Sequence, residues 1–362
     1  MHEKYLLAAL KEAELGQGAC APNPSVGAVA VKNGEIIARA WHRGAGTPHA
    51  ERVLIETLPA NETGVTLYVT LEPCNHHGRT PPCVDAIVNY GFEKVVFAYR
   101  DPNPIVAAND TSSLLSSCGV SVEHIAISEI DVFYQAYSFW TKTGRPWVTA
   151  KIAQTFDGKI ARPNGEPIIL SNACCSGFTH KNRLGSDIIL TTARTVNQDN
   201  PQLNVRLPEL TCAKPVAIID TRLNLNPAST ILSTATHCHI FYDERIKHPA
   251  QVDNRTYHPV PVVGDLLDLD TIMQTLGRLG YHSVWLEAGG ILFSAMHKAR
   301  LVQRTHVYLV PLILGPNAVS AYCQDDLFGS SKHISWMPMR DNMIATLDWE
   351  HKGSQWSSNR TI

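Results

Sequence analysis

The stretch E-P-C-N-H-H-G-R-T-P-P-C, residues 72–83, decides how the first part of this chain folds, because it holds two cysteines with eight residues between them. Two histidines, an arginine and two prolines lie between Cys74 and Cys83. The pair could form a disulfide, a structural zinc site or part of an active site. The choice depends on the residues that the rest of the chain brings to them.

Length and composition indicate a globular protein of two domains. The chain has 362 residues, more than a single hydrophobic core usually serves, with 44% hydrophobic and 18% charged residues. A net charge of -2 gives no basic surface for nucleic acid or anionic membrane. No apolar run reaches the roughly 18 residues that cross a bilayer, and the N-terminus has an amphipathic helix pattern instead of a signal peptide. We therefore expect a cytoplasmic protein without nucleic-acid or membrane partners.

The cysteines indicate a reducing compartment. There are nine of them, an odd number, scattered without the regular spacing of a disulfide framework. Reduced thiols are the expected state for most, including Cys20, Cys118 and the adjacent Cys174 and Cys175. For Cys74 and Cys83 a bound metal is therefore favoured over a disulfide.

The hydrophobic pattern alternates between strand and helix periods, which predicts mixed sheets covered by helices. The glycine and proline of T-G-R-P at 143–146 predict a domain boundary, giving domains 1–145 and 146–362. The first domain should hold helices at 3–15, 48–57, 82–90, 109–118 and 128–142, and strands at 26–31, 35–40, 65–71, 94–99 and 120–125. The second should hold strands at 147–153, 187–191, 215–220, 238–242, 283–287 and 305–310, and helices at 173–184, 268–279 and 290–299.

A histidine and a glutamate near position 50 complete a candidate zinc site. In T-P-H-A-E-R, residues 47–52, Thr47 could cap a helix whose first position is Pro48, which places His49 and Glu51 in the first turn. Cys83 should also begin a helix, where the helix dipole lowers the pKa of a thiol. His49, Cys74 and Cys83 would leave a fourth tetrahedral position for water, the arrangement of a catalytic zinc.

Such a zinc would give the site hydrolytic chemistry. Bound zinc lowers the pKa of water from about 15.7 to about 7, and Glu51 could carry the proton to a leaving amine. The combination of H-x-E with two cysteines is the signature of zinc-dependent nucleobase deaminases, in which the glutamate is not a ligand. The competing interpretations are a surface glutamate beside a capping histidine, and two core cysteines.

Several motifs together resemble the bifunctional deaminase-reductases of riboflavin biosynthesis. They are P-N-P-S-V-G-A-V at 22–29, H-A-E at 49–51, residues 72–83 and D-P-N-P at 101–104. The similarity continues through K-I-A-Q-T-F-D-G-K at 151–159, T-V-N-Q-D-N-P-Q-L-N-V-R at 195–206 and W-L-E-A-G-G at 285–290, and ends near residue 318. The resemblance implies a cytidine-deaminase-like α/β/α domain followed by a dihydrofolate-reductase-like α/β domain.

The resemblance also implies the reaction and the site residues. The first domain would bind one zinc and deaminate 2,5-diamino-6-ribosylamino-4(3H)-pyrimidinone 5′-phosphate. The second would reduce the ribosyl chain to ribityl with NADPH. In the family pattern, the deaminase pocket contains Asn23, His42, His76, Arg79, Asp101 and Asn103. Arg79 suits a phosphate, and the amides and the carboxylate suit pyrimidine donors and acceptors. For Asn23 and Asn103, the alternative is turn chemistry beside proline.

The second domain lacks G-x-G-x-x-G, but A-G-G at 288–290 follows a strand and precedes a helix, which suits a pyrophosphate. A simple tight turn is the alternative. The resemblance implies that the substrate contacts Pro167, Arg183, Leu203, Arg206 and Glu287. It also implies that the cofactor contacts Gln154, Ile169, Thr195, Asp199, Thr221, Gly289, Gly290, Ile291, Leu292, Phe293, Ser294 and Ala295.

Three positions depart from the family pattern. G-E-P-I-I at 165–169 puts Pro167 where the pattern has a hydroxyl and Ile169 where it has tryptophan, and Asn200 replaces an acid. These changes concern the kinetics of reduction.

Two other functions compete with this one. One is a deaminase of nucleosides or RNA with a non-catalytic second domain, and the other is a non-enzymatic zinc module, which would need a fourth protein ligand. We also expect a homo-oligomer, a dimer or a tetramer.

Overall fold

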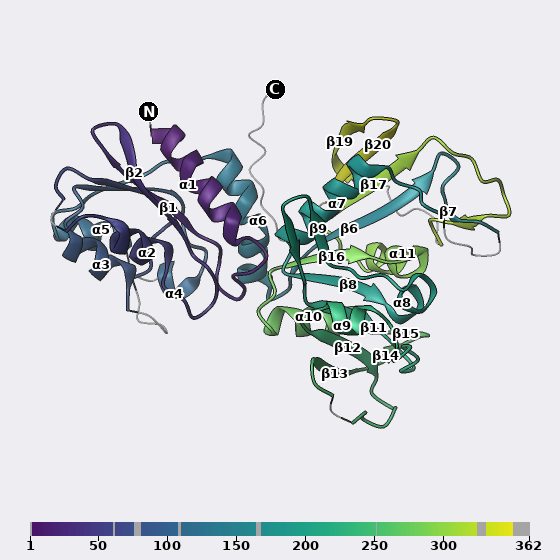
Figure 1. Ribbon diagram of the computed structural model, residues 1–362. Helices are drawn as coiled ribbons and strands as arrows, with labels where there is room; N and C mark the ends of the chain where they lie inside the picture. The colour runs from purple at the N-terminus through teal and green to yellow at the C-terminus, as the bar shows by residue number, and fades with distance from the viewer. Residues whose placement is uncertain are drawn as a thin grey trace. The chain divides into compact units, whose positions relative to one another are not determined.

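The chain divides into two compact units (Figure 1). The computed structural model describes residues 2–60, 62–75, 81–107, 110–163, 168–250, 252–323 and 331–349. Residues 1–146 with 276–282 form the first unit, and residues 147–275 with 283–362 form the second. We call them the N-terminal and C-terminal units and describe each by itself.

The N-terminal unit is built around one mixed sheet with the strand order β2-β1-β3-β4-β5. Strand β1 pairs antiparallel with β2 and β3, whereas β3, β4 and β5 run parallel. Its strands are β1 (Gly27–Lys32), β2 (Glu35–Trp41), β3 (Thr66–Leu71), β4 (Lys94–Tyr99) and β5 (Ser121–His124). Its helices are α1 (His2–Gly16), α2 (Ala50–Thr57), α3 (Cys83–Tyr90), α4 (Pro104–Ala107), α5 (Thr111–Ser117) and α6 (Ser128–Thr143).

Two hydrophobic cores make this unit a three-layer α/β/α structure. Leu54 of α2, Ile87 of α3 and Leu115 of α5 pack on one face of the sheet. Leu6 of α1 and Ile130 of α6 belong to the core on the other face. Helices on both faces bury most of the central strands β1, β3 and β4, which agrees with the expected layering.

At two positions in this sheet the local backbone requires a glycine. Asn33 and Gly34 join β1 to β2 with φ angles of 50° and 83°, the left-handed values that a tight hairpin turn requires. At Gly27, an added Cβ would lie 2.0 Å from the carbonyl oxygen of Ala9, so only glycine lets α1 lie this close to β1.

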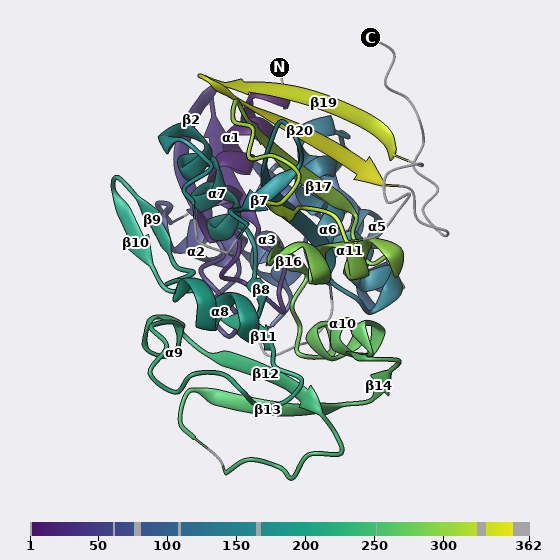
Figure 2. The same ribbon diagram turned by 90° about the vertical axis from the view of Figure 1, so that its right-hand side faces the viewer.

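The C-terminal unit contains a nine-stranded sheet among its described residues, in the order β13-β12-β11-β8-β16-β6-β17-β20-β19 (Figure 2). The strands from β13 to β17 are parallel, and β20 and β19 add an antiparallel edge. These strands are β6 (Trp147–Thr155), β8 (Ile188–Thr192), β11 (Val216–Ile219), β12 (Cys238–Asp243), β13 (Arg255–Val260), β16 (Ser283–Glu287), β17 (Arg304–Val310), β19 (Ser331–Met339) and β20 (Asn342–Trp349).

Helices and three short strand pairs complete this part of the chain. The helices are α7 (Ala173–Gly185), α8 (Ala193–Asp199), α9 (Ile231–Thr234), α11 (Gly290–Lys298) and α10 (Leu269–Arg278), whose last three residues belong to the N-terminal unit. The small strands are β7 (Lys159–Ala161), β9 (Val205–Leu207), β10 (Leu210–Cys212), β14 (Val262–Val263), β15 (Leu266–Leu267) and β18 (Val319–Ser320). Because parallel strands end at one edge of the sheet, the segments after β6, β8, β11 and β16 lie at that edge.

The structure corrects the expected start of α2. The helix begins at Ala50, with His49 as an extended N-cap residue that makes no side-chain cap bond. The prediction that Thr47 caps the helix and that Pro48 is its first residue was wrong, because the Thr47 hydroxyl instead donates to the carbonyl of Gly44. Glu51 does lie in the first turn, as expected.

Candidate active sites

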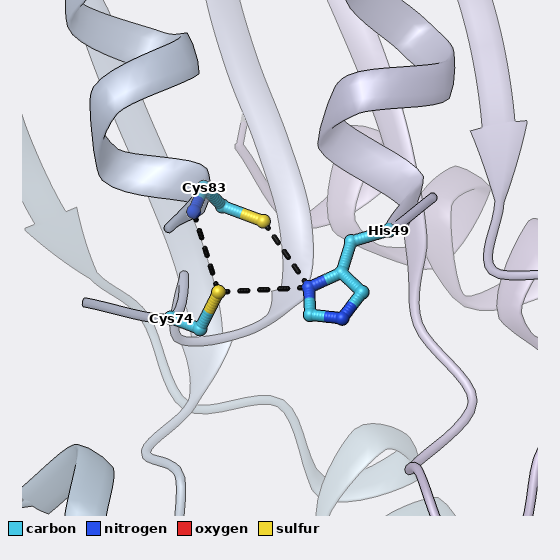
Figure 3. A group of neighbouring side chains, drawn as sticks. All are labelled: His49, Cys74 and Cys83. Atoms are coloured by element: carbon cyan, nitrogen blue, oxygen red, sulfur yellow. Dashed lines mark hydrogen bonds between the residues drawn. The ribbon is translucent and has the colours of Figure 1, made fainter. Parts of the chain in front are cut away.

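Three side chains from separate elements meet in the N-terminal unit (Figure 3). His49 lies at the N-cap of α2, Cys74 follows β3, and Cys83 is the first residue of α3. The His49 Nδ1 atom is 3.3 Å from the Cys83 sulfur and 3.5 Å from the Cys74 sulfur. All three ligand atoms lie within 4.8 Å of one another, a donor set of one nitrogen and two sulfurs that fits zinc.

Hydrogen bonds favour the thiolate form of one of the two cysteines in this group. A hydrogen bond from Cys83 lowers the pKa of Cys74 to about 4 against the opposing effect of burial, and the Cys83 backbone amide also donates to the Cys74 sulfur at 3.3 Å. Cys83 holds the proton of the pair, so its own pKa is raised. The helix start was expected to lower the pKa of Cys83, but the hydrogen bond that Cys83 shares with Cys74 raises it instead.

Glu51 lies beside these ligands and is almost fully buried, with 3% of its surface exposed. Burial raises the pKa of its carboxyl, and the charge of Cys74 raises it further. A carboxyl with a raised pKa can hold a proton near neutral pH and pass it on, as general acid-base catalysis requires.

Two polar side chains lie next to the cluster. The His42 ring lies edge-on to the His49 ring, with 5.3 Å between ring centres. His42 Nδ1 donates to the carbonyl of Pro48 at 3.1 Å, which leaves Nε2 to accept from the Asn23 amide at 3.3 Å. Burial lowers the pKa of His42, so the neutral ring that this pattern needs is favoured.

Asp101 and Asn103 follow β4. Burial raises the pKa of Asp101 to about 6, against hydrogen bonds from the Asn103 amide at 2.9 Å and the Tyr137 hydroxyl at 3.1 Å. The Asn103 side chain accepts from the amide of Ile105, so it also serves the turn chemistry considered from sequence. His76 and Arg79 lie outside the described residues.

A cavity of about 1150 Å³ opens in the C-terminal unit at the edge where the parallel strands end. Many of the residues expected from sequence line it: Ile169, Arg183, Thr195, Asp199, Leu203, Thr221, Glu287, Gly289, Gly290, Ile291, Leu292 and Ala295. Ile169 is 92% exposed, so it covers little of this space. Such a volume suits a large organic ligand.

A charged network lies in this cavity. Arg183 donates to both carboxylate oxygens of Glu287, at 2.5 and 3.0 Å, and the Trp285 indole donates to one of them at 2.7 Å. Burial opposes ionisation of Glu287, but Arg183 and Lys151 outweigh it and lower its pKa to about 2. Burial in turn lowers the pKa of Lys151.

The remaining expected residues are not among those that line the cavity. Arg206 is exposed and donates to the side chains of Gln202 and Asn204. Gln154, Phe293 and Ser294 are buried, and the Ser294 hydroxyl accepts from the amide of Cys323. Pro167 lies outside the described residues. Asn200 ends α8 in a left-handed conformation, with φ of 42°, which an asparagine tolerates well.

Sequence reasoning overlooked three polar residues. Lys151 lies in a motif that was recognised, and a lysine within a buried parallel strand is itself a signal. Trp285 precedes Glu287 by two residues on β16, which places both side chains on one face. Tyr137 gives no local signal, because α6 comes to Asp101 only through the fold.

Comparisons with known proteins extend these observations. A family profile described as the RibD C-terminal domain matches residues 146–352, and one described as the cytidine and deoxycytidylate deaminase zinc-binding region matches residues 1–99. The riboflavin biosynthesis protein RibD of Escherichia coli is 34% identical over 329 residues, which cover 87% of this chain and 89% of that protein. The chain belongs to the RibD family.

Other RibD proteins agree. RibD of Bacillus amyloliquefaciens is 30% identical, over 92% of this chain and 91% of that protein. The structure of Acinetobacter baumannii RibD has a TM-score of 0.83 at 28% identity and covers 96% of this chain and 99% of that one. A Thermotoga maritima diaminohydroxyphosphoribosylaminopyrimidine deaminase/5-amino-6-(5-phosphoribosylamino)uracil reductase has a TM-score of 0.82 at 28% identity, covering 96% and 98%.

Membership of the RibD family confirms the expected fold class and the bifunctional deaminase and reductase character of this enzyme. Its cofactors are zinc in the deaminase domain and NADPH in the RibD reductase domain. A deaminase without a second activity is not favoured, and neither is a non-enzymatic zinc module. None of the helices in the described ranges has both the length and the apolar character to cross a membrane.

Proposed function

We propose that the chain carries out two successive steps of riboflavin biosynthesis on one pyrimidine. The domain formed by residues 1–145 deaminates 2,5-diamino-6-ribosylamino-4(3H)-pyrimidinone 5′-phosphate. The domain formed by residues 146–362 then reduces the ribosyl chain of the product to ribityl. The observation that supports this proposal most strongly is the buried Glu51 carboxyl beside the three convergent ligand atoms of His49, Cys74 and Cys83.

In the deaminase, His49, Cys74 and Cys83 would hold zinc, which supplies Lewis-acid activation of water when bound. The raised pKa of Glu51 lets its carboxyl take a proton and deliver it to the departing amine. Asn23, His42, His76, Asp101 and Asn103 bind the pyrimidine, and Arg79 binds the phosphate. The Asn23–His42 hydrogen bond supports this assignment, because it fixes the side chains of both residues.

In the reductase, NADPH supplies the hydride when bound. Gly289 and Gly290 would bring amide groups at the start of α11 to its pyrophosphate, and Ile291, Leu292, Phe293, Ser294 and Ala295 follow in the first turns of α11. Gln154, Ile169, Thr195, Asp199 and Thr221 form the rest of the cofactor site.

The ionised Glu287, held by Arg183 and Trp285, faces the substrate. Pro167, Leu203 and Arg206 complete the substrate site. Arg206 does not line the cavity, so we propose that it reaches the phosphate by a change of side-chain rotamer.

Mass spectrometry of the products tests the two activities together. The purified protein with substrate alone should release ammonia and yield the deaminated pyrimidine. Adding NADPH should increase the product mass by two hydrogens. Retention of the original amine, or a product that NADPH leaves unchanged, would contradict the corresponding half of the proposal.

The variant Glu51→Gln separates the two halves. It keeps all three zinc ligands and removes the proton carrier, so deamination should fall about 100-fold or more while zinc content stays at one per chain. Reduction of pre-deaminated substrate should continue at the wild-type rate. Ammonia release near the wild-type rate would rule out this role for Glu51.

We also propose that the protein is a cytoplasmic homo-oligomer, a dimer or a tetramer, that binds neither nucleic acid nor membranes. Strand β19 supports the oligomer, since it is an edge strand with Ile334 and Trp336 exposed. Light scattering coupled to size exclusion should give a mass of two or four chains, and a single-chain mass would contradict the proposal.

A further inference from the structure

The order of the strands determines which end of the C-terminal cavity lies near the substrate residues and which end lies far from them. The strand order β11-β8-β16-β6 places the end of β16 between β6 on one side and β8 and β11 on the other. Lys151 on β6 and Glu287 at the end of β16 mark the substrate side. A dinucleotide with its pyrophosphate at Gly289 and Gly290 and its nicotinamide toward Lys151 and Glu287 would extend its adenosine toward β8 and β11.

Two arginines line the cavity on the adenosine side. Thr192 at the end of β8 pairs in register with Ile219 at the end of β11. Arg194 follows Thr192 by two residues, Arg222 follows Ile219 by three, and both line the cavity. Adjacent strands lie about 4.8 Å apart, so the two segments leave the sheet side by side.

Hydrogen bonds fix these two segments to each other. The Asn197 side chain on α8 donates to the Asn224 carbonyl at 2.8 Å and accepts from the Asn226 amide at 2.9 Å. Figures 1 and 2 both show α8 close to β8 and β11. The backbones that carry the two arginines are therefore held in one arrangement before a ligand binds.

Neither guanidinium has an anionic partner in the described part of the chain. Arg183, in the same cavity, is by contrast paired with Glu287. The structure shows no salt bridge or hydrogen bond from Arg194 or Arg222 to another described residue. Two cations without an anionic partner among the described residues, beside one end of a nucleotide-sized cavity, can bind a doubly charged phosphate, which a guanidinium contacts through two hydrogen bonds.

Besides Glu287, three acidic residues line the cavity: Asp199, Asp220 and Asp265. Asp220 lines the cavity, but its two oxygens accept from the amides of Asn224 and Leu225, each at 2.8 Å. Asp199 lies five residues beyond Arg194, about 7.5 Å along the axis of α8. An arginine near the adenosine ribose distinguishes NADP sites from NAD sites, where a carboxylate binds the 2′-hydroxyl.

We propose that Arg194 and Arg222 bind the 2′-phosphate of NADPH and thereby make the reductase select NADPH over NADH. This inference rests on the proposed function and deepens it, because it assigns the residues that distinguish the two coenzymes. The 2′-phosphate is the one group by which they differ, so its partners affect NADPH alone.

Calorimetric titration with nucleotide fragments tests the assignment without catalysis. Adenosine 2′,5′-bisphosphate carries the distinguishing phosphate, and adenosine 5′-monophosphate lacks it. Arg194→Gln and Arg222→Gln should each weaken binding of the bisphosphate roughly 10-fold, as expected for a charge-assisted contact at a partly exposed site. Binding of the monophosphate should not change. Arg300→Gln, which removes an exposed charge from the same unit outside the cavity lining, should affect neither nucleotide.

Coenzyme kinetics provide the second measurement. Each variant should lower the ratio of kcat/KM with NADPH to kcat/KM with NADH roughly 10-fold, through a higher KM for NADPH. Equal losses for both fragments and both coenzymes would overturn the proposal, since they would mean general adenosine contacts. Unchanged affinity for the bisphosphate in both variants would overturn it too.

The outcomes also separate this inference from the proposed function. A wild-type protein that prefers the bisphosphate but reduces no pyrimidine would refute the reductase and leave the 2′-phosphate site standing. A wild-type protein that reduces the pyrimidine equally well with NADH and NADPH would refute the site and leave the reductase standing.

Discussion

Burial and hydrogen bonds act in opposite directions on the charge of Asp101, which we propose to bind the pyrimidine. Its pKa is raised to about 6 by burial, while the Tyr137 hydroxyl, 3.1 Å away, works to lower it. Between about pH 4, the ordinary pKa of an aspartate, and about pH 6, Asp101 is protonated in the folded protein and ionised in the unfolded chain. Its contribution to stability therefore falls as the pH rises through that range. If the carboxylate form binds the pyrimidine, deaminase kcat/KM should rise through pH 6.

Replacing Tyr137 with phenylalanine should move this midpoint upward. A hydrogen bond to a charged group contributes about 1.5 kcal/mol or more, and one pKa unit corresponds to about 1.4 kcal/mol, so the expected shift is about one unit. The pH profile of deaminase kcat/KM measures it. Tyr90→Phe is the matched control, because that hydroxyl donates to the Pro59 carbonyl, and its profile should stay at the wild-type midpoint. A Tyr137→Phe profile that also stays there would show that Asp101 does not titrate in substrate binding.

The Arg183–Glu287 pair predicts a large effect on stability. Arg183→Met leaves a buried carboxylate with only Lys151 and Trp285 to offset its charge, and should destabilise the C-terminal unit by about 3 kcal/mol or more at neutral pH. Urea denaturation at pH 7 measures the change. Arg304→Met is the control, because Arg304 pairs with Asp348 at a partly exposed site and should cost about 0–1 kcal/mol.

The loss of stability caused by Arg183→Met should depend on pH. In the wild-type chain the folded pKa of Glu287 is depressed to about 2, so its ion pair stabilises the protein above the ordinary pKa near 4.5 and loses effect as the pH falls toward 2. In Arg183→Met the carboxyl protonates more readily, so the difference from wild type should shrink below about pH 4.5. Similar costs for both arginine variants at pH 7 would mean that the Glu287 pair behaves as a surface pair.

The start of helix α11 offers a sharp comparison between two adjacent glycines. A Cβ on Gly290 would lie 2.6 Å from the carbonyl oxygen of Ala321, whereas a Cβ on Gly289 would meet nothing within 4 Å. Gly290→Ala should therefore destabilise the C-terminal unit by about 1–3 kcal/mol, because backbone must move. Gly289→Ala should stay within about 0.5 kcal/mol of wild type.

Thermal unfolding of the two glycine variants decides the point. For a unit of this size, 1 kcal/mol shifts Tm by about 2–4 °C, so the Gly290→Ala shift should be easily measured. Equal Tm values for the two variants would show that the strand β18 segment yields to the methyl group.

Elements with strong local patterns could be predicted from the sequence, and elements defined by distant partners could not. The alternating apolar strands of the parallel sheet and the Asn33–Gly34 hairpin follow from local residues. Strands β19 and β20 were overlooked because the last forty residues carry no recognised motif, and β20 is fixed by pairing with the distant β17. Strand β13 was overlooked as well, since it forms by pairing with β12 at the sheet edge.

The sites divide in the same way. Cys74, Cys83, His49 and Glu51 could be found from their types and order, because zinc chemistry restricts which residues can serve. The contact of Tyr137 with Asp101 and the pairing of Arg183 with Glu287 join residues 36 and 104 positions apart. No local pattern encodes such contacts, so only the fold shows them.

Each unit has its own hydrophobic core, which predicts that ligands act on the units separately. The proposed zinc ligands His49, Cys74 and Cys83 all belong to the N-terminal unit, where they join α2, α3 and the segment after β3. Removing zinc with a chelator should therefore lower the Tm of that unit and abolish deamination. The transition of the C-terminal unit and the reduction of pre-deaminated substrate should stay unchanged.

NADPH should produce the complementary effect. A ligand present at 100 times its Kd stabilises the unit that binds it by about 2.7 kcal/mol, so NADPH should raise the Tm of the C-terminal unit alone. Differential scanning calorimetry with and without chelator, and with and without NADPH, gives four curves that separate the two transitions. Restoring zinc to the chelated protein is the control. It should bring the Tm of the N-terminal unit back to its original value and restore deamination. If chelation shifts both transitions, or NADPH stabilises both, the two units unfold as one cooperative structure, and the assignment of one cofactor to each independent unit is wrong.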